Sequence, residues 1–144
     1  IIEGIESTIS AGIRPGLNIL FGNIGDNKET LSRAVEFLLK YDDGAQLRTI
    51  KPVTPYPGSH LYYTAIDNGF IKDCEDFYEN KHLNSDLLTV NFTELSDDAF
   101  HKCLFEANSK LITNYYNNQL SHVLDSAKKL YLENDATFRG FRQR

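Results

Sequence analysis

The stretch that decides the fold is "LFGNIGDNKET", residues 20–30. An apolar run stops at Gly22, a second glycine follows at Gly25, and an acidic residue then opens a segment with helical periodicity. This order predicts a strand, a tight elbow and a helix. Such an elbow either holds a ligand against its backbone or only turns the chain, because glycine permits both.

The segment after the elbow has the spacing of an amphipathic helix. Its apolar residues recur on one face, at Leu31, Ala34, Val35, Leu38 and Leu39. We expect the helix to begin at Asp26, whose carboxylate caps the first amides, with Glu29 as its capping-box partner. It should end near Gly44, where glycine allows a left-handed turn.

The elements around this helix predict an α/β fold. A helix over residues 2–9 and a strand over 17–22 precede it, and a strand over 45–50 follows. This order with short links favours parallel strands joined by right-handed crossovers. Prolines at 52, 55 and 57 predict a stiff loop after the second strand, and Ser59 then caps a helix that ends at Gly69.

Past Phe70 the alternation of strands and helices fades. Residues 87–92 predict a short strand, and Ser96 caps a long helix that should bend or break at "NNQ", 117–119. Another helix follows, with an apolar stripe of Leu120, Val123, Leu124, Ala127, Leu130 and Tyr131. We therefore divide the chain into an α/β part, 1–72, and a mainly helical extension, 73–144.

Alternation along the strands bears on the kind of sheet. Leu17, Ile19 and Phe21 oppose Asn18, Leu20 and Gly22 in the first strand, and Ala45, Leu47 and Thr49 oppose Gln46, Arg48 and Ile50 in the second. One face of each strand is thus more polar. A doubly wound sheet requires two apolar faces, whereas a barrel lines its interior with polar side chains, so the pattern favours part of a barrel over a doubly wound sheet.

Composition excludes several classes of protein. The net charge of −5 argues against a nucleic-acid binder, which needs a surplus of Lys and Arg. No apolar run approaches the roughly 20 residues that cross a bilayer, and we expect a soluble, cytoplasmic chain. The sequence contains no Met, even at position 1, which predicts a piece of a longer protein. Its two strands need neighbours from upstream, and their exposed edge predicts a homo-oligomer of the isolated piece.

Two elements in order carry a family resemblance. "GLNILFGNIGDNKETL" followed by "LRTIKPVTPYPGSHLYYTAIDNGFI" resembles the second half of a radical S-adenosylmethionine domain. This is the kind often preceded by a cobalamin-binding domain, as in the anaerobic oxidative cyclases of Mg-protoporphyrin ester and related methyltransferases. Gly22, Gly25, Glu29 and Thr30 match the family's Gly-x-Pro-Gly-Glu-Thr elbow, with Ile24 in place of the proline. Residues 54–59 match its Pro-Tyr-Pro-Gly-Thr element.

The resemblance implies the C-terminal portion of a partial (β/α) barrel that holds a [4Fe–4S] cluster and S-adenosylmethionine, with a small-molecule substrate at its mouth and cobalamin in an upstream domain of some members. It implies that Leu20 contacts the adenine and that the backbone of residues 22–24 approaches it closely. Arg48, if it points into the barrel, suits the carboxylate of S-adenosylmethionine or of an acidic substrate. The implied cofactor-facing set is Leu20, Gly22, Asn23, Ile24, Gly25, Arg48 and Pro55.

The cluster itself requires residues that this chain lacks. The family's CxxxCxxC loop is absent, and Cys74 and Cys103 are too few to replace it. The four histidines show no metal-ligand spacing, and we assign no catalytic residue and no metal ligand here. The chain alone should be inert, while the full-length enzyme would be a radical-initiated oxidoreductase or methyltransferase. The alternative is a non-catalytic α/β module whose elbow holds an anion at a helix N-terminus.

Overall fold

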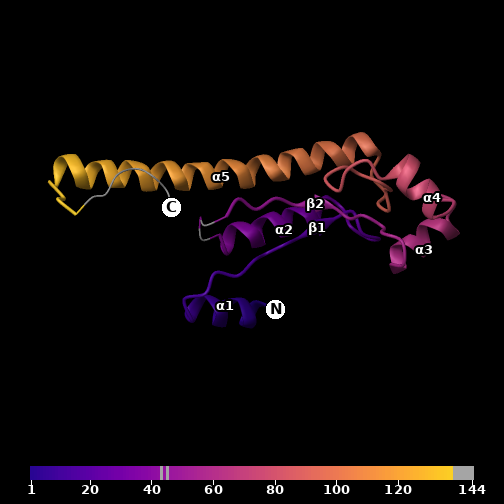
Figure 1. Ribbon diagram of the computed structural model, residues 1–144, viewed down its shortest axis with the longest axis horizontal. Coiled ribbons are helices and arrows are strands. Elements are labelled where there is room, and N and C mark those ends of the chain that lie inside the picture. The colour runs from indigo at the N-terminus through magenta and orange to yellow at the C-terminus, as the bar shows by residue number, and fades with distance from the viewer. Residues whose placement is uncertain (43, 45, 138–144) are drawn as a thin grey trace.

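The structure, a computed structural model, describes residues 1–42, 44 and 46–137. It is mixed α/β but mostly helical (Figure 1). Its elements are α1 (Ile2–Ser10), β1 (Leu20–Phe21), α2 (Lys28–Lys40), β2 (Lys51–Pro52), α3 (His60–Asp67), α4 (Cys74–Asp76), the π-helical turn η1 (Phe77–Lys81) and α5 (Asp97–Leu132). Helix α5 runs along the molecule, with α2 and the strands beside its first half and α3 and α4 at one end.

The two strands pair in parallel, as the order of elements predicts. Leu20 lies beside Lys51, and Phe21 beside Pro52. Each strand has only two residues, so the predicted strands over 17–22 and 45–50 are too long, and the second is also displaced toward the C-terminus. Position 45 lies outside the described residues. Within the described chain no third strand pairs with β1 or β2. Two strands this short are marginal by themselves and depend on packing against helices.

Helices α2 and α5 cover one face of the strand pair. The cluster that fills this layer contains Phe21, Leu31, Val35, Leu38, Ile50, Phe100, Leu104, Ala107 and Leu111. Leu17 and Ile19 pack against it, whereas Asn18 and Leu20 are exposed, which confirms the predicted alternation for these residues. Gly22, predicted on the face of Asn18 and Leu20, is instead buried beside Phe100, because the elbow turns the chain there. Burying each large apolar side chain contributes about 1.5–3 kcal/mol, so this one covered face stabilises the strands.

The start of α2 differs in detail from the prediction. Asn27, not Asp26, is the N-cap, and its side chain accepts hydrogen bonds from the amides of Glu29 and Thr30 at 2.9 and 3.1 Å. Thr30 completes the capping box instead of Glu29, because its hydroxyl accepts from the Asn27 amide. The shift of one residue frees the Asp26 carboxylate for the elbow.

The other predicted caps hold. Ser59 accepts a hydrogen bond from the amide of Tyr62 at the start of α3, and Ser96 accepts one from Ala99 at the start of α5. Helix α1 ends before Gly12, which adopts a positive φ of 74°. In the first two cases a serine hydroxyl accepts from a free amide at the helix start, and in the third a glycine adopts the left-handed conformation that ends a helix.

A second cluster lies at the end of the molecule that holds α3 and α4. It contains Tyr62, Ala65, Ile71, Phe77 and Val90. The predicted strand over residues 87–92 is not formed: the segment is irregular and carries Val90 into this cluster. Both clusters draw residues from each side of the boundary between 72 and 73, so the two predicted parts of the chain share their cores.

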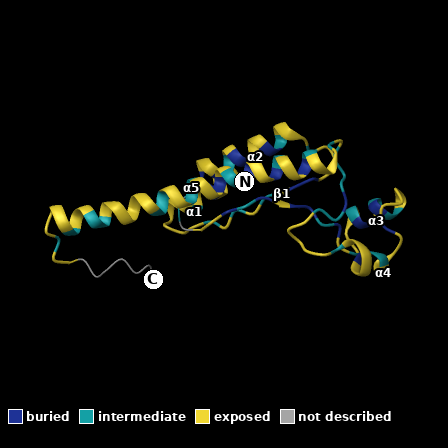
Figure 2. Cartoon of the chain, turned by 90° about the horizontal axis from the view of Figure 1, so that it is seen from above, coloured by how far each residue is buried: buried dark blue, intermediate teal, exposed yellow. Residues whose placement is uncertain are grey.

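Helix α5 is continuous over 36 residues, and the predicted break at 117–119 does not occur. Gln119 donates a hydrogen bond from Nε2 to the Gly44 carbonyl at 2.6 Å, which ties this part of the helix to the loop after α2. The segment also contains no Pro or Gly to kink it. Beyond it the helix projects from the body, and Leu120, Leu124 and Tyr131 are exposed (Figure 2).

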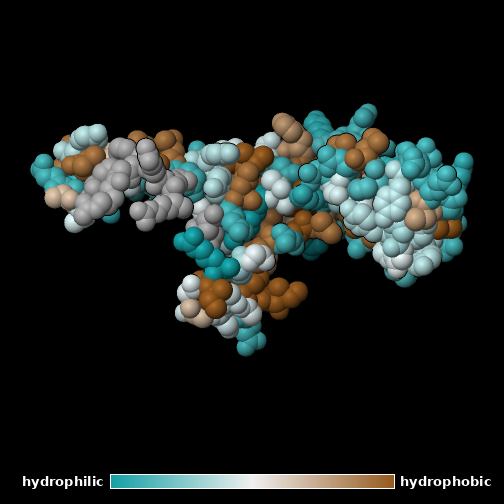
Figure 3. All heavy atoms as spheres, in the orientation of Figure 1, coloured by the Kyte–Doolittle hydropathy of each residue, from teal (hydrophilic) through white to brown (hydrophobic). Residues whose placement is uncertain are grey.

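The N-terminal helix forms a small separate lobe in Figure 3, where apolar side chains gather. Ile5 of α1 is buried, but Ile2 and Ile9 are exposed, so only part of the predicted apolar face is covered. The Tyr41 hydroxyl and the Glu6 carboxylate hold α1 to the end of α2 across 3.2 Å. None of the helices in the described residues combines the length and apolar character that crossing a membrane requires.

Candidate functional site

The glycine elbow is closed by one carboxylate. Asp26 Oδ2 accepts hydrogen bonds from the amides of Gly22 and Asn23 at 3.0 and 2.9 Å, and its Oδ1 accepts from the Thr30 hydroxyl at 3.1 Å. The Ile24 amide donates to the side-chain oxygen of Asn23 at 2.9 Å. These amides all donate within the segment, so the elbow does not present them to an anion, and the anion-binding alternative loses its main support.

The two glycines of the elbow differ in what surrounds them. Both have positive φ, 103° at Gly22 and 86° at Gly25. A Cβ on Gly22 would lie 2.8 Å from Cε2 of Phe100, whereas a Cβ on Gly25 would meet no atom within 4 Å. Gly22 is therefore required for packing against α5 as well as for the turn. Gly25 is required only for the turn, and its outer side is open.

The proline-rich loop leaves β2 beside the elbow. The Val53 amide donates to the Phe21 carbonyl at 2.8 Å, so the segments that follow β1 and β2 leave the strand pair at the same end. Pro55 is fully buried, which places its ring out of reach of a ligand on the surface. The following turn closes with a bond from the Ser59 amide to the Tyr56 carbonyl and leads into α3.

The face of the strand pair away from α2 and α5 is open. Leu20 is 58% exposed, and the Lys51 side chain beside it in register is 51% exposed. Asn23, Ile24 and Gly25 of the elbow are also exposed, directly after β1. Four of the predicted cofactor-facing residues therefore form one accessible group at the carboxyl end of the strands, where ligands bind in parallel sheets.

Arg48 does not belong to this group. Its side chain is buried, with Nη1 3.2 Å from the Tyr41 carbonyl and 3.4 Å from Asp42 Oδ1, and Nη2 3.1 Å from the Pro15 carbonyl. It shares the covered face with Ile50, so neither alternative weighed from the sequence holds here: it is not an exposed strand residue, and it does not point into an open interior. A guanidinium has enough donors to join the three segments, and this is a structural role.

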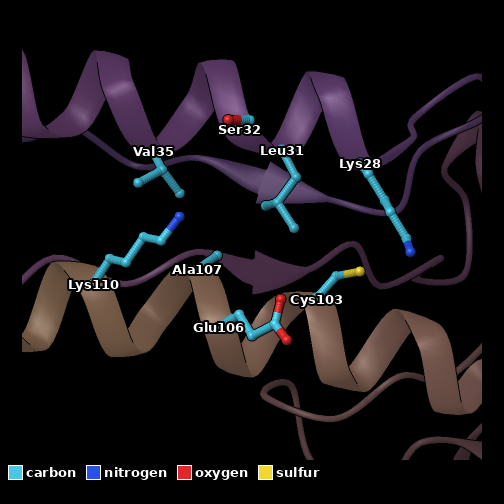
Figure 4. A pocket seen from close by; sticks show the side chains of 8 residues that line it. All are labelled: Lys28, Leu31, Ser32, Val35, Cys103, Glu106, Ala107 and Lys110. Carbon is cyan, nitrogen blue, oxygen red and sulfur yellow. The ribbon is translucent and has the colours of Figure 1, made fainter.

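A shallow groove lies between the two covering helices (Figure 4). Leu31 and Val35 of α2 face Ala107 of α5 across it, and Lys28 and Lys110 come from opposite helices. Cys103 also lines it and is half-buried, whereas Cys74 is exposed on α4; both are free thiols. The residues that line the groove all belong to α2 and α5, and none of them is in the elbow's exposed group.

Three important residues escaped the sequence analysis. Asp26 was expected to cap the start of α2, and its carboxylate instead closes the elbow. Asn108 bonds both main-chain groups of Ile50, accepting from its amide at 2.8 Å and donating to its carbonyl at 2.9 Å. Lys51 had a usable signal, because it alternates with the apolar Ile50 and Pro52 and so had to face the other way.

The described residues contain no group of three or more His, Cys, Asp and Glu side chains placed to hold a metal ion. Comparison with known proteins gave no match to a family model, to a curated protein or to a solved structure. The function is therefore inferred from the strand pair and from the two segments that follow it, the elbow and the proline-rich loop.

Proposed function

We propose that this chain is the C-terminal part of the partial (β/α) barrel of a radical S-adenosylmethionine enzyme, where it contributes surface that faces the cofactor and the substrate. The observation that carries the proposal is the asymmetry of the strand pair. One face and one edge are closed by the chain's own helices, and the opposite face and edge are open. This asymmetry is what the last two strands of a larger parallel sheet require.

The closed edge belongs to β2. Lys51 directs its amide toward β1, where it meets the Ile19 carbonyl at 3.4 Å, so Ile50 and Pro52 direct their main-chain groups outward. Pro52 has no amide to donate, which suits it to the outer edge of a sheet. The outward groups of Ile50 are satisfied by the side chain of Asn108 on α5. No further strand is needed on this side.

The open edge belongs to β1. The same alternation directs the main-chain amide and carbonyl of Leu20 away from β2, and no strand of the described chain pairs with them. An exposed edge of this kind is a template for another strand. We assign this position to the preceding strand of the barrel, so that α2 and α5 lie outside and the face of Leu20 and Lys51 lies inside.

The exposed residues fit S-adenosylmethionine and do not fit the [4Fe–4S] cluster. Leu20 offers an apolar surface for adenine, and Asn23, Ile24 and Gly25 are exposed beside it. The two cysteines, on α4 and α5, do not form a cluster site, so the [4Fe–4S] ligands and any cobalamin domain belong upstream. A cluster held upstream would supply the electron for reductive cleavage of S-adenosylmethionine, and the exposed residues of this chain would bind and orient its adenine.

The proposal is tested on the complete gene and its protein. We expect a CxxxCxxC loop encoded upstream of Ile1, and iron–sulfur absorbance in the reconstituted full-length enzyme. The present chain alone should show no such absorbance and only weak binding of S-adenosylmethionine by calorimetry, because the cluster that chelates the methionine end is missing. A gene without the cysteine loop, or micromolar binding by this chain alone, would contradict the assignment.

A further inference from the structure

The open strand face carries one cation at the end where the strands exit. The segments 17–22 and 46–53 contain two basic residues, Arg48 and Lys51. Arg48 is buried on the covered face, whereas Lys51 stands beside Leu20 on the open face. A cation next to an exposed apolar side chain, at the carboxyl end of parallel strands, is an arrangement that recognises an amphipathic anion.

A turn from another part of the chain supplies the counter-charge. Asp86 Oδ1 lies 2.6 Å from Lys51 Nζ. The turn is organised by Asn84, whose side chain accepts from the Asp86 amide at 2.8 Å and whose carbonyl accepts from the Leu87 amide at 3.0 Å. Asp86 is thus presented to Lys51 by a formed turn and not by a loose side chain.

The same turn is attached to the proline-rich loop. The Tyr56 hydroxyl and Ser85 Oγ lie 2.8 Å apart, and the His82 ring stacks on Phe77 and meets the edge of Tyr56. These contacts flank Asp86 but do not involve its carboxylate. The Asp86 side chain can therefore leave Lys51 by rotating, while the turn stays in place.

We propose that Lys51 binds the carboxylate or phosphate group of a small-molecule ligand lying on the open strand face, with its apolar part on Leu20, and that Asp86 occupies the ammonium when this ligand is absent. Both charged side chains are half exposed, 51% and 60%, and an exposed ion pair is weak enough to be exchanged for a ligand. The proposal rests on the proposed function only in taking the open face as ligand-facing, and it requires no cluster.

The experiment titrates the present chain with inorganic phosphate and, separately, with acetate at constant ionic strength, followed by amide chemical shifts in NMR. We expect shifts at Leu20, Lys51 and Asp86. Asp86→Asn removes the competing carboxylate and should tighten binding two- to five-fold, by roughly the strength of an exposed pair. Lys51→Gln should weaken it about two- to five-fold, because the ammonium that the anion would contact is half exposed. The tighter of the two probes identifies the ligand's acidic group.

Lys110→Gln is the matched control, because it removes one exposed lysine from helix α5, on the other side of the strand pair, and should bind as the original chain does. Equal affinity in Lys51→Gln, no gain in Asp86→Asn, or shifts confined to other regions would overturn the proposal. Denaturation of each variant checks that it is folded. A gene without the cysteine loop would remove the proposed function and leave this anion site standing, so the two failures are distinguishable.

Discussion

The two sides of the strand pair are built differently. On the closed side, α2 and α5 cover Phe21 and Ile50, and Asn108 satisfies the outer edge of β2. On the open side, Leu20 and Lys51 face away from every helix that covers the strands. A self-sufficient small domain would cover both faces, because two strands alone bury too little surface. The chain's own helices therefore stabilise the closed side of the strand pair, and the open side requires another segment to cover it.

The largest expected effect is on the closed side, at the elbow. Gly22→Ala adds a Cβ against the Phe100 ring at an unfavourable φ, so we expect a loss of about 2–5 kcal/mol in the free energy of unfolding. Gly25→Ala is the matched control, with strained φ and open space, and should lose about 1–2 kcal/mol. Urea denaturation measures both. Equal losses would mean that Phe100 does not close this side.

The closed edge provides the second test. Asn108→Ala leaves the buried amide and carbonyl of Ile50 without partners, and we expect a loss of about 1–3 kcal/mol in the free energy of unfolding. Gln119→Ala removes one bond from the same helix to Gly44 and should lose about 0.5–1.5 kcal/mol. Thermal and urea unfolding give both values. If the Asn108 variant loses no more than the Gln119 variant, the edge of β2 is not closed in the way described.

The open side provides the third test. We predict that the isolated chain self-associates through the exposed edge of β1, as exposed strand edges do. Leu20→Lys places a charge there and should weaken association about tenfold, with monomer stability within about 0.5 kcal/mol of the original. Light scattering over a concentration series measures association. A chain that stays monomeric at high concentration would show that the open side needs no partner.

The smallest effect lies outside the strand pair and serves as a reference. Hydrogen bonds from the Lys72 amide and the Asn80 side chain lower the pKa of Asp76. Its contribution to stability is therefore complete above the unfolded pKa, about 3.9, and is lost as pH falls through the lower folded value. Asp76→Asn should be slightly less stable at pH 7, and the difference should vanish in acid. A difference that persists unchanged at low pH would rule out this linkage.

The sequence predicted the features that depend on neighbouring residues. Helix periodicity placed Leu31, Val35 and Leu38 correctly on the covered face of α2, and the serine caps of α3 and α5 hold. Alternation placed Phe21 inward and Leu20 outward. These patterns are local, so a single sequence contains them.

The features that failed depend on distant contacts. Arg48 suited a ligand only if it pointed into an open interior. The Tyr41 carbonyl, the Asp42 carboxylate and the Pro15 carbonyl, 33 positions away, hold it inside instead. The expected break at 117–119 does not occur where Gln119 finds the Gly44 carbonyl. Of the expected cofactor-facing residues, Leu20, Asn23, Ile24 and Gly25 are exposed, whereas Pro55 is buried by contacts that its own sequence neighbourhood does not contain.

The hydrogen bonds between Asn108 and Ile50 span 58 positions of the sequence, and this separation imposes an order on synthesis. As the chain leaves the ribosome, β1 and β2 emerge long before the residue that closes the edge of β2. Until then that edge stays open to strands of other nascent chains, because contacts of high sequence separation form late. A translational pause after β2 would lengthen this vulnerable interval, and a pause after α5 would not.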